Sequence, residues 1–206
     1  MRRETRNALI AVFFFIVIPA LVVLDHRLGG RLRQHIYQTA YPDGDWQKYH
    51  AKVFTVLRVI DGDTLDIDVP DDKHEHTRIR LIGVDTPETK HPTVGLMHYG
   101  PEATEFTASL ALGRQVTVLL DTVGDQRCRY GRLLAYIQLP DNKILNAEII
   151  KNGYGYAYLS FPHSEFAAYQ ILMQEAIDNK VGLWENAVRD DLPKWLRSRR
   201  PDLLRY

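Results

Sequence analysis

The sequence has a single cysteine, Cys128, and no net charge at pH 7. One thiol cannot form a disulfide within the chain, nor can it make a cysteine metal cluster. Residues 52–185 carry thirteen basic and nineteen acidic side chains, whereas a protein that coats nucleic acid through its overall field would have a basic domain. Any role with nucleic acid must therefore depend on a local basic site or on a bound metal.

The composition is that of a globular protein, because 45% of the residues are hydrophobic and 25% are charged. The length of 206 residues suits one domain with appendages. We divide the chain into an N-terminal segment (1–24), a linker (25–51), a domain (52–185) and a basic tail (186–206). The tail contains Trp195, and we interpret it as a solvated end, with a surface for membrane lipid or nucleic acid as the alternative.

Seventeen consecutive apolar residues, ALIAVFFFIVIPALVVL, occupy positions 8–24. Their number is at the lower limit for a membrane-spanning helix, and no small-residue cleavage site precedes Asp25, which favours an anchor over a removed signal peptide. Three arginines before the segment place the N-terminus in the cytoplasm, although three more after it weaken this bias. The expectation is a membrane-anchored protein whose domain lies outside the cytoplasm, or a secreted protein if the segment is cleaved.

The stretch RIRLIGVDTPE, residues 78–88, gathers charges of both signs. Its first seven residues alternate in a way that predicts a half-buried strand, which ends before Pro87. Arg80, Asp85 and Glu88 would lie near one strand end, where opposite charges favour a site for an anion and a cation. Strict alternation puts Arg80 and Asp85 on opposite faces, so a common site requires a twist or bulge, which Gly83 could permit.

The tetrapeptide Asp61-Gly62-Asp63-Thr64 lies between two β-rich runs and predicts a hairpin turn. Taken alone, it indicates nothing more than a turn. Its functional interpretation is that Asp63 directs a carboxylate to the same place as Asp85. The two side chains would then supply hard oxygen ligands of the kind that Ca²⁺ or Mg²⁺ requires.

The segment RCRYGR, residues 127–132, holds three arginines around one tyrosine and one glycine. A solvated basic turn is the simpler interpretation. The alternative is a phosphate clamp, because a guanidinium group binds phosphate oxygens bidentately and Tyr130 can hydrogen-bond or stack.

Further strands are predicted at 53–60, 65–69, 115–120 and 132–139, and helices at 101–111, 144–151 and 165–180. A helix after the third of five short strands, with two more at the end, indicates an α+β protein. Its centre would be a five-stranded β-barrel of the OB type carrying about three helices.

Five motifs together resemble the staphylococcal nuclease (thermonuclease) family: IDGDT at 60–64, RLIGVDTPETKHP at 80–92, YGPEA at 99–103, YGRLLAYI at 130–137 and GLW at 182–184. The resemblance covers residues 53–185, in order and with similar spacing. It does not extend to the N-terminal segment, the linker or the tail.

The resemblance implies a calcium-dependent nuclease that acts on DNA or RNA with little sequence preference and leaves 3′-phosphate ends. It assigns metal binding to Asp63, Asp85 and the Thr86 carbonyl, with Mg²⁺ or Mn²⁺ as less favoured ions. Three side chains are implied to be catalytic: Glu88 as general base, and Arg80 and Arg132 on the scissile phosphate. Arg129 and Tyr130 match positions that contact a terminal phosphate. Loss of Arg80, Glu88 or Arg132 is expected to lower turnover by orders of magnitude with little effect on folding.

Two other functions remain open at this point. A non-catalytic binding module for nucleic acid or protein would have lost at least one metal or arginine position, and none is lost here. A membrane-tethered cation-binding protein would use the arginines only as ion-pair partners. For the nuclease, we expect a monomer with no protein partner.

Overall fold

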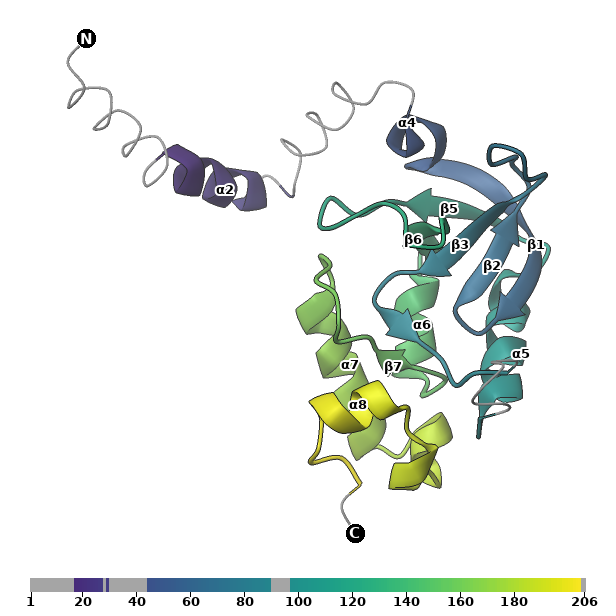
Figure 1. Ribbon diagram of the computed structural model, residues 1–206, viewed down its shortest axis with the longest axis vertical. Coiled ribbons are helices and arrows are strands. Elements are labelled where there is room, and N and C mark those ends of the chain that lie inside the picture. Colours follow the sequence, from purple (N-terminus) through teal and green to yellow (C-terminus); the bar gives the residue numbers. More distant parts are fainter. Residues whose placement is uncertain (1–16, 28, 30–43, 90–96, 205–206) are drawn as a thin grey trace. The chain divides into compact units, whose positions relative to one another are not determined.

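The computed structural model describes residues 17–27, 29, 44–89 and 97–204 (Figure 1). The chain divides into two compact units, residues 1–47 and 48–206. Helix α2 (Ile18–Arg27) belongs to the first unit, and the short helix α4 (Asp45–Tyr49) crosses the boundary. None of the helices in the described part of the chain has the length and apolar character needed to span a membrane. Residues 8–16 of the predicted membrane segment lie outside the described residues.

The second unit is built on a closed barrel of five strands in the order β1-β2-β3-β6-β5 (Figure 1). The strands are β1 (Lys52–Asp61), β2 (Thr64–Ile67), β3 (Thr77–Leu81), β5 (Gln115–Leu119) and β6 (Leu133–Gln138). All neighbouring pairs are antiparallel except β3 and β6, which are parallel. This arrangement fits an OB-fold and confirms the predicted barrel.

The alternation along β3 separates the core from the site. Ile79 and Leu81 are buried inside the barrel, where they join side chains such as Leu65 and Leu133. The residues between them point to the other face of the sheet. Arg80 therefore lies on the outer face of the barrel, where an anion can approach it.

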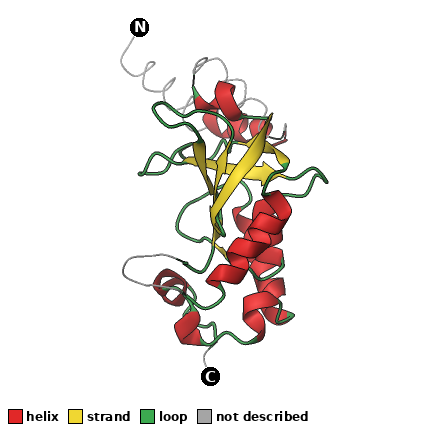
Figure 2. Cartoon of the chain, turned by 90° about the vertical axis from the view of Figure 1, so that its right-hand side faces the viewer, coloured by secondary structure: helices red, strands yellow, loops and turns green. Residues whose placement is uncertain are grey.

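Three helices match the predicted ones: α5 (Gly100–Ala111), which lies between β4 and β5 in the chain, and α6 (Leu145–Lys151) and α7 (Phe166–Asp178), which come after β6. In Figure 1, α6 lies between α5 and α7. Figure 2 shows these helices gathered at one end of the barrel. Pro101 stands in the first turn of α5, where its missing N–H has no helical partner to lose.

The predicted strand 78–84 is wrong in one respect, because the chain turns at Ile82-Gly83. After this turn, the two-residue strand β4 (Val84–Asp85) leaves the barrel and pairs with β7 (Tyr156–Ala157). Gly83 has φ +75°, and a Cβ on it would meet the His163 ring at 2.4 Å. The turn therefore requires glycine both for its positive φ and for the space that the His163 ring occupies. It is at this turn that the chain makes the bend that the sequence indicated at Gly83.

The C-terminal residues are packed against the second unit, so the interpretation of a solvated end is wrong. They form the 3₁₀ turns η2 (Gly182–Glu185) and η3 (Arg189–Asp191) and helix α8 (Lys194–Arg199). Leu192, Leu196 and Leu203 are each at most 5% exposed. Three buried leucines in the last fifteen residues fix this segment by apolar burial.

Replacement of Asn146 by alanine is expected to lower the free energy of unfolding by about 3 kcal/mol. The fully buried side chain accepts a hydrogen bond from the Ile137 N–H (3.1 Å) and donates to the carbonyls of Ile82 (2.9 Å) and Ala135 (3.2 Å). Alanine would remove the side-chain partner of the Ile137 N–H and of the Ile82 carbonyl at the junction of α6, β6 and the turn before β4, whereas the Ala135 carbonyl keeps the Ile82 N–H at 3.0 Å. Urea unfolding measures the loss, and Asn179→Ala, which removes one exposed local bond to Glu175, is the matched control. Equal losses in both variants would contradict this account.

Candidate active site

The hairpin turn between β1 and β2 brings the first carboxylate to the site. Asp63 is 6% exposed, and its carbonyl accepts the Leu81 N–H at 2.9 Å, which ties the turn to the end of β3. From the other side, the Thr107 hydroxyl of α5 donates to the Gly62 carbonyl at 2.6 Å. The carboxylate therefore stands on a turn that is held by both the barrel and a helix.

Arg80 lies between two carboxylates. Its guanidinium forms ion pairs with Asp63 and with Asp85, the latter at 2.6 Å. The side chains of Arg80 and Asp85 are 15% and 19% exposed, so both ion pairs are largely removed from water. The predicted gathering of Arg80, Asp63 and Asp85 is thus present in the structure, although this geometry does not test their catalytic or metal-binding roles.

Thr86 completes this group. Its backbone N–H donates to Asp63 Oδ2 at 3.0 Å, and its side chain is 4% exposed. A Cβ on Gly62 would meet Thr86 Oγ1 at 2.7 Å. Glycine at position 62 is therefore needed because the two turns approach each other closely. Its backbone conformation is not the reason, because its φ is not in the left-handed region.

The site holds more negative charge than its one paired arginine neutralises. Burial, together with the charges of Asp63 and Glu88, raises the pKa of Asp61 to about 6. The pKa of Asp85 is also raised, mainly by burial and, against the effect of Arg80, by Asp63 and Glu88. These mutual effects place the half-buried Glu88 within electrostatic range of the other acids.

Asp61 belongs to this acidic group, although we did not single it out from the sequence. It lies at the end of β1, and its carboxylate accepts the Gly62 N–H at 2.7 Å. The available signal was its place in the same Asp-Gly-Asp turn as Asp63. The hairpin brings both ends of that turn to one side.

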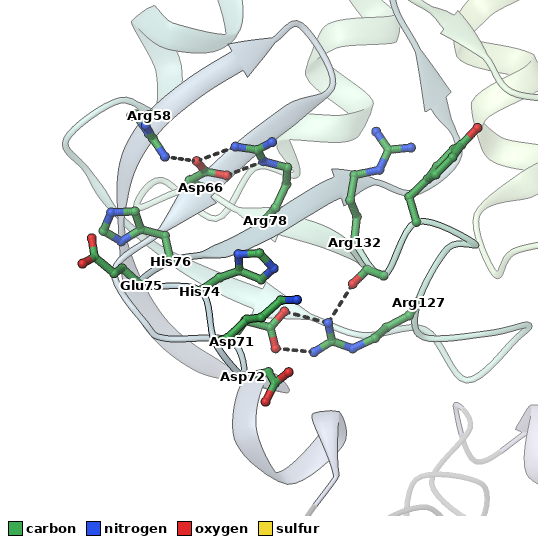
Figure 3. A pocket seen from close by; sticks show the side chains of 13 residues that line it. Arg58, Asp66, Asp71, Asp72, His74, Glu75, His76, Arg78, Arg127 and Arg132 are labelled. Atoms are coloured by element: carbon green, nitrogen blue, oxygen red, sulfur yellow. Dashed lines mark hydrogen bonds and ion pairs between the residues drawn. The ribbon is translucent and has the colours of Figure 1, made fainter.

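Arg132 lies immediately before β6, beside a polar pocket of about 780 Å³ (Figure 3). The pocket is also lined by Arg78, which is two residues before Arg80 on β3. Arg132 Nε donates to Cys128 Sγ at 3.4 Å, and its guanidinium lies 5.5 Å from the centre of the Tyr130 ring. Among the described residues, Arg132 has no acidic ion-pair partner, so its charge is available to an anion.

The rest of this pocket carries charges of both signs that are largely paired. Asp66 binds Arg58 and Arg78, and Asp71 binds Arg127 at 2.7 Å (Figure 3). His74 and His76 line the same pocket. The paired acids reduce the positive field there, whereas the charge of Arg132 is not offset by an ion pair in the described structure.

The two predicted terminal-phosphate residues lie together on the loop before β6. Arg129 Nη2 donates to the Tyr130 hydroxyl at 2.6 Å, and its guanidinium lies 4.7 Å from the ring centre. Tyr130 is 67% exposed. They are thus open to a ligand, and no contact joins them to Arg80 in the described structure.

Trp195 is a site residue that the sequence did not indicate. Its indole N–H donates to Asp85 Oδ2 at 2.8 Å, across 110 positions of sequence. No spacing rule connects an aromatic residue in a basic terminal segment with a carboxylate so distant in sequence.

The donor set fits a hard divalent cation. Within the described ranges, no three His, Cys, Asp or Glu side chains form a metal-binding group; the ligands that the family resemblance implies are two carboxylates and one carbonyl. Ca²⁺ accepts such oxygen ligands and completes its shell with water or substrate oxygens. Burial, together with the neighbouring acids, raises the pKa values of Asp61 and Asp85, so the negative charges of this group repel one another.

Comparison with known proteins connects this geometry with a family. Residues 78–186 match the family described as staphylococcal nuclease homologue. The chain is 36% identical to a thermonuclease of Staphylococcus intermedius, over 73% of this chain and 89% of that protein. It is 34% identical to an uncharacterized endonuclease of Escherichia coli, over 68% of this chain and 81% of that protein. With endonuclease YncB of Bacillus subtilis it shares 33% identity, over 65% of this chain and 62% of the relative.

Proposed function

The chain belongs to the staphylococcal nuclease family, and on that premise we propose that it is a calcium-dependent nuclease that hydrolyses phosphodiester bonds of DNA or RNA with little sequence preference. The observation that carries this proposal is the buried arrangement of Arg80 between Asp63 and Asp85. It brings together a guanidinium group, which can bind phosphate, and two carboxylates, which can bind a hard cation. The relatives that are named thermonuclease or endonuclease support the reaction class.

Arg80 would change partners during the reaction. In the structure it forms ion pairs with the two carboxylates, and with a cation bound they would no longer depend on it for a partner. The guanidinium would then be free to turn toward the phosphate oxygens, which gain charge in the transition state.

Arg132 would bind the same phosphate from a second side. It has no carboxylate to leave among the described residues, and it lies immediately before β6, the strand that runs parallel to β3. Two arginines, one on β3 and one at the start of β6, can hold the equatorial oxygens more tightly as attack proceeds. Glu88 would accept the proton of the attacking water, so that the 5′-oxygen leaves and the phosphate stays on the 3′-side.

The cation would be held by the carboxylates of Asp63 and Asp85 and by the Thr86 carbonyl. When bound, calcium supplies a compact positive charge that polarises the phosphoryl oxygen. Each carboxylate oxygen has two lone pairs, so a hydrogen bond from Thr86 N–H or Trp195 does not prevent coordination.

Hydrolysis of single-stranded DNA and of RNA by the full chain tests the proposal, with Ca²⁺, with Mg²⁺ and with a chelator. We expect cleavage with calcium that stops in the chelator, and products that a 3′-phosphatase can dephosphorylate. Binding of nucleic acid without cleavage would favour the alternative of a non-catalytic binding module. Calcium binding without either binding or cleavage of nucleic acid would favour the alternative of a cation-binding protein.

For localisation, we propose a single N-terminal membrane anchor with the nuclease outside the cytoplasm. The proposal is supported by the apolar sequence of residues 8–24 and the arginines before it. Recovery of the full chain from membranes by detergent, but not by salt or carbonate, is the expected result. Release of a shortened protein into the medium would instead show cleavage and secretion.

A further inference from the structure

Trp195 lies beyond the C-terminal end of the family match and contacts the site. The match ends at residue 186, whereas the indole N–H of Trp195 donates to Asp85 Oδ2 at 2.8 Å. The other oxygen of this carboxylate accepts from Arg80. Asp85 is therefore held from two sides by donors of different kinds.

The helix that carries Trp195 is firmly attached. Leu196, beside it in α8, is fully buried. The Arg189 guanidinium donates to the carbonyls of Leu203 (2.8 Å) and Pro201 (3.2 Å), which closes the segment on itself. Arg200 donates to Gln174 of α7 at 3.2 Å. These contacts position the indole from the body of the second unit.

Aromatic rings hold the indole plane. Trp195 meets Tyr158 edge-on, with ring centres 5.0 Å apart and an interplanar angle of 83°. It meets Tyr156 of β7 in the same way at 6.3 Å. Because β7 pairs with β4, Tyr156 lies opposite Asp85 in one small sheet, and Tyr158 follows directly after β7. The indole N–H is therefore aimed at the carboxylate by packing as well as by the hydrogen bond.

The two donors on Asp85 have different fates in the proposed reaction. Arg80 turns to the phosphate. The indole of Trp195 is neutral, so a phosphate does not attract it electrostatically and it stays hydrogen-bonded to the carboxylate. Once Arg80 has turned, the bond from Trp195 is the described side-chain contact that still orients Asp85. A metal ligand that is oriented by an outer hydrogen bond binds its ion more tightly than a free one.

We propose that Trp195 is a positioning residue for the cation site, which holds the Asp85 carboxylate in the orientation that binds calcium. The inference rests on the proposed function, because it takes Asp85 to be a calcium ligand. It adds a residue of the C-terminal segment to the site and gives that segment a role in setting the calcium requirement.

The test is calorimetric titration of the metal-free full chain with calcium chloride. Trp195→Phe keeps a ring against Tyr156 and Tyr158 and removes the N–H donor. We expect its Kd for calcium to rise by about 10–100-fold. The calcium concentration that gives half-maximal cleavage should rise by the same factor, while kcat at saturating calcium stays near the wild-type value.

Trp184→Phe is the matched control. Trp184 also meets Tyr156 edge-on, at 5.7 Å and 80°, but its indole N–H has no hydrogen-bond partner in the described part of the chain. We expect an unchanged Kd in this variant. Equal weakening in both variants would show that the ring packing matters rather than the donor, which would overturn the inference.

Two further outcomes are decisive. An unchanged or lower Kd in Trp195→Phe would show that the indole does not orient the ligand or that it competes with the ion. A wild-type chain that binds no calcium would overturn this inference together with the calcium part of the proposed function, and the wild-type titration alone identifies that case.

The wild-type protein offers an independent measurement if the variant does not fold. Hydrogen exchange of the Trp195 indole N–H, followed by NMR, should be slow in the metal-free protein. It should remain slow when calcium and a nucleoside 3′,5′-bisphosphate are added together. Exchange as fast as that of an exposed indole in the loaded protein would contradict a lasting bond to Asp85.

Discussion

Glu88→Gln is expected to lower the turnover of nucleic-acid cleavage by about 10²–10⁴-fold. The amide has nearly the shape of the carboxylate, but it cannot accept the proton of the attacking water. The stability of the protein should not fall, because the Glu88 charge repels Asp61 and Asp85 and raises their pKa values. Initial rates at saturating calcium, together with thermal unfolding of both proteins, measure the two effects.

The matched control is Glu102→Gln, in the first turn of α5, where the side chain is exposed. It removes the same charge from the same unit and should leave turnover near the wild-type value. If Glu88→Gln retained full activity, Glu88 would not be the base. If it lost activity and stability together, its effect would be on folding.

Local signals accounted for the parts of the site that lie near one another in sequence. The Asp-Gly turn and the strand before Pro87 were each visible in the sequence, and pairing of β2 with β3 places Thr64 opposite Arg80. Because of this register, Asp63 and Arg80 are neighbours across a hairpin. Short connections of this kind follow rules of turn and alternation that a sequence displays.

The parts that were missed depend on contacts between distant residues. The turn at Gly83 exists because β4 pairs with β7 and because the His163 ring occupies the place of a side chain. Trp195 reaches Asp85 because three leucines of the tail are buried and because its ring packs on Tyr156 and Tyr158. The leucines follow no periodic pattern in the tail, and the two tyrosines lie outside it. A basic charge pattern favoured a solvated end, but burial of apolar side chains outweighed it.

Arg80→Gln is expected to differ from Glu88→Gln by losing both activity and stability. Turnover should fall by about 10²-fold or more, because a guanidinium donor to the phosphate is lost. The free energy of unfolding of the metal-free protein at pH 7.5 should fall by about 3 kcal/mol, since removal of one partner leaves buried charges uncompensated. The sequence led us to expect little effect on folding, and the buried ion pairs of Arg80 with Asp63 and Asp85 change that expectation.

The matched control is Arg78→Gln, two residues earlier on the same face of β3. Arg78 pairs with Asp66, but its side chain is 47% exposed and Arg58 also binds that carboxylate at 2.7 Å. Asp66 itself is buried, but it keeps the second cation when a half-exposed arginine is removed, so the loss should be below about 1 kcal/mol. Urea unfolding of the three proteins gives the comparison.

The pH dependence of the Arg80→Gln loss has a definite sign. Asp61 and Asp85 have pKa values raised above the usual value of 3.8, to about 6 for Asp61. Between pH 3.8 and about 6, the folded protein therefore binds more protons than the unfolded chain. The free energy of unfolding falls as the pH rises through this range. Without Arg80, both pKa values rise further. The deficit of the variant should consequently be larger at pH 7.5 than at pH 5, where protonation relieves the repulsion.

Calcium should reverse much of the same loss. A cation bound by Asp63 and Asp85 replaces the charge that glutamine lacks, and a ligand that binds only the folded state stabilises it in proportion to the logarithm of its concentration. Saturating calcium should thus restore the stability of Arg80→Gln but leave turnover low, because the phosphate still lacks its donor. A variant that calcium does not stabilise would show that these two carboxylates are not the cation site, even if Arg80 proves essential for cleavage.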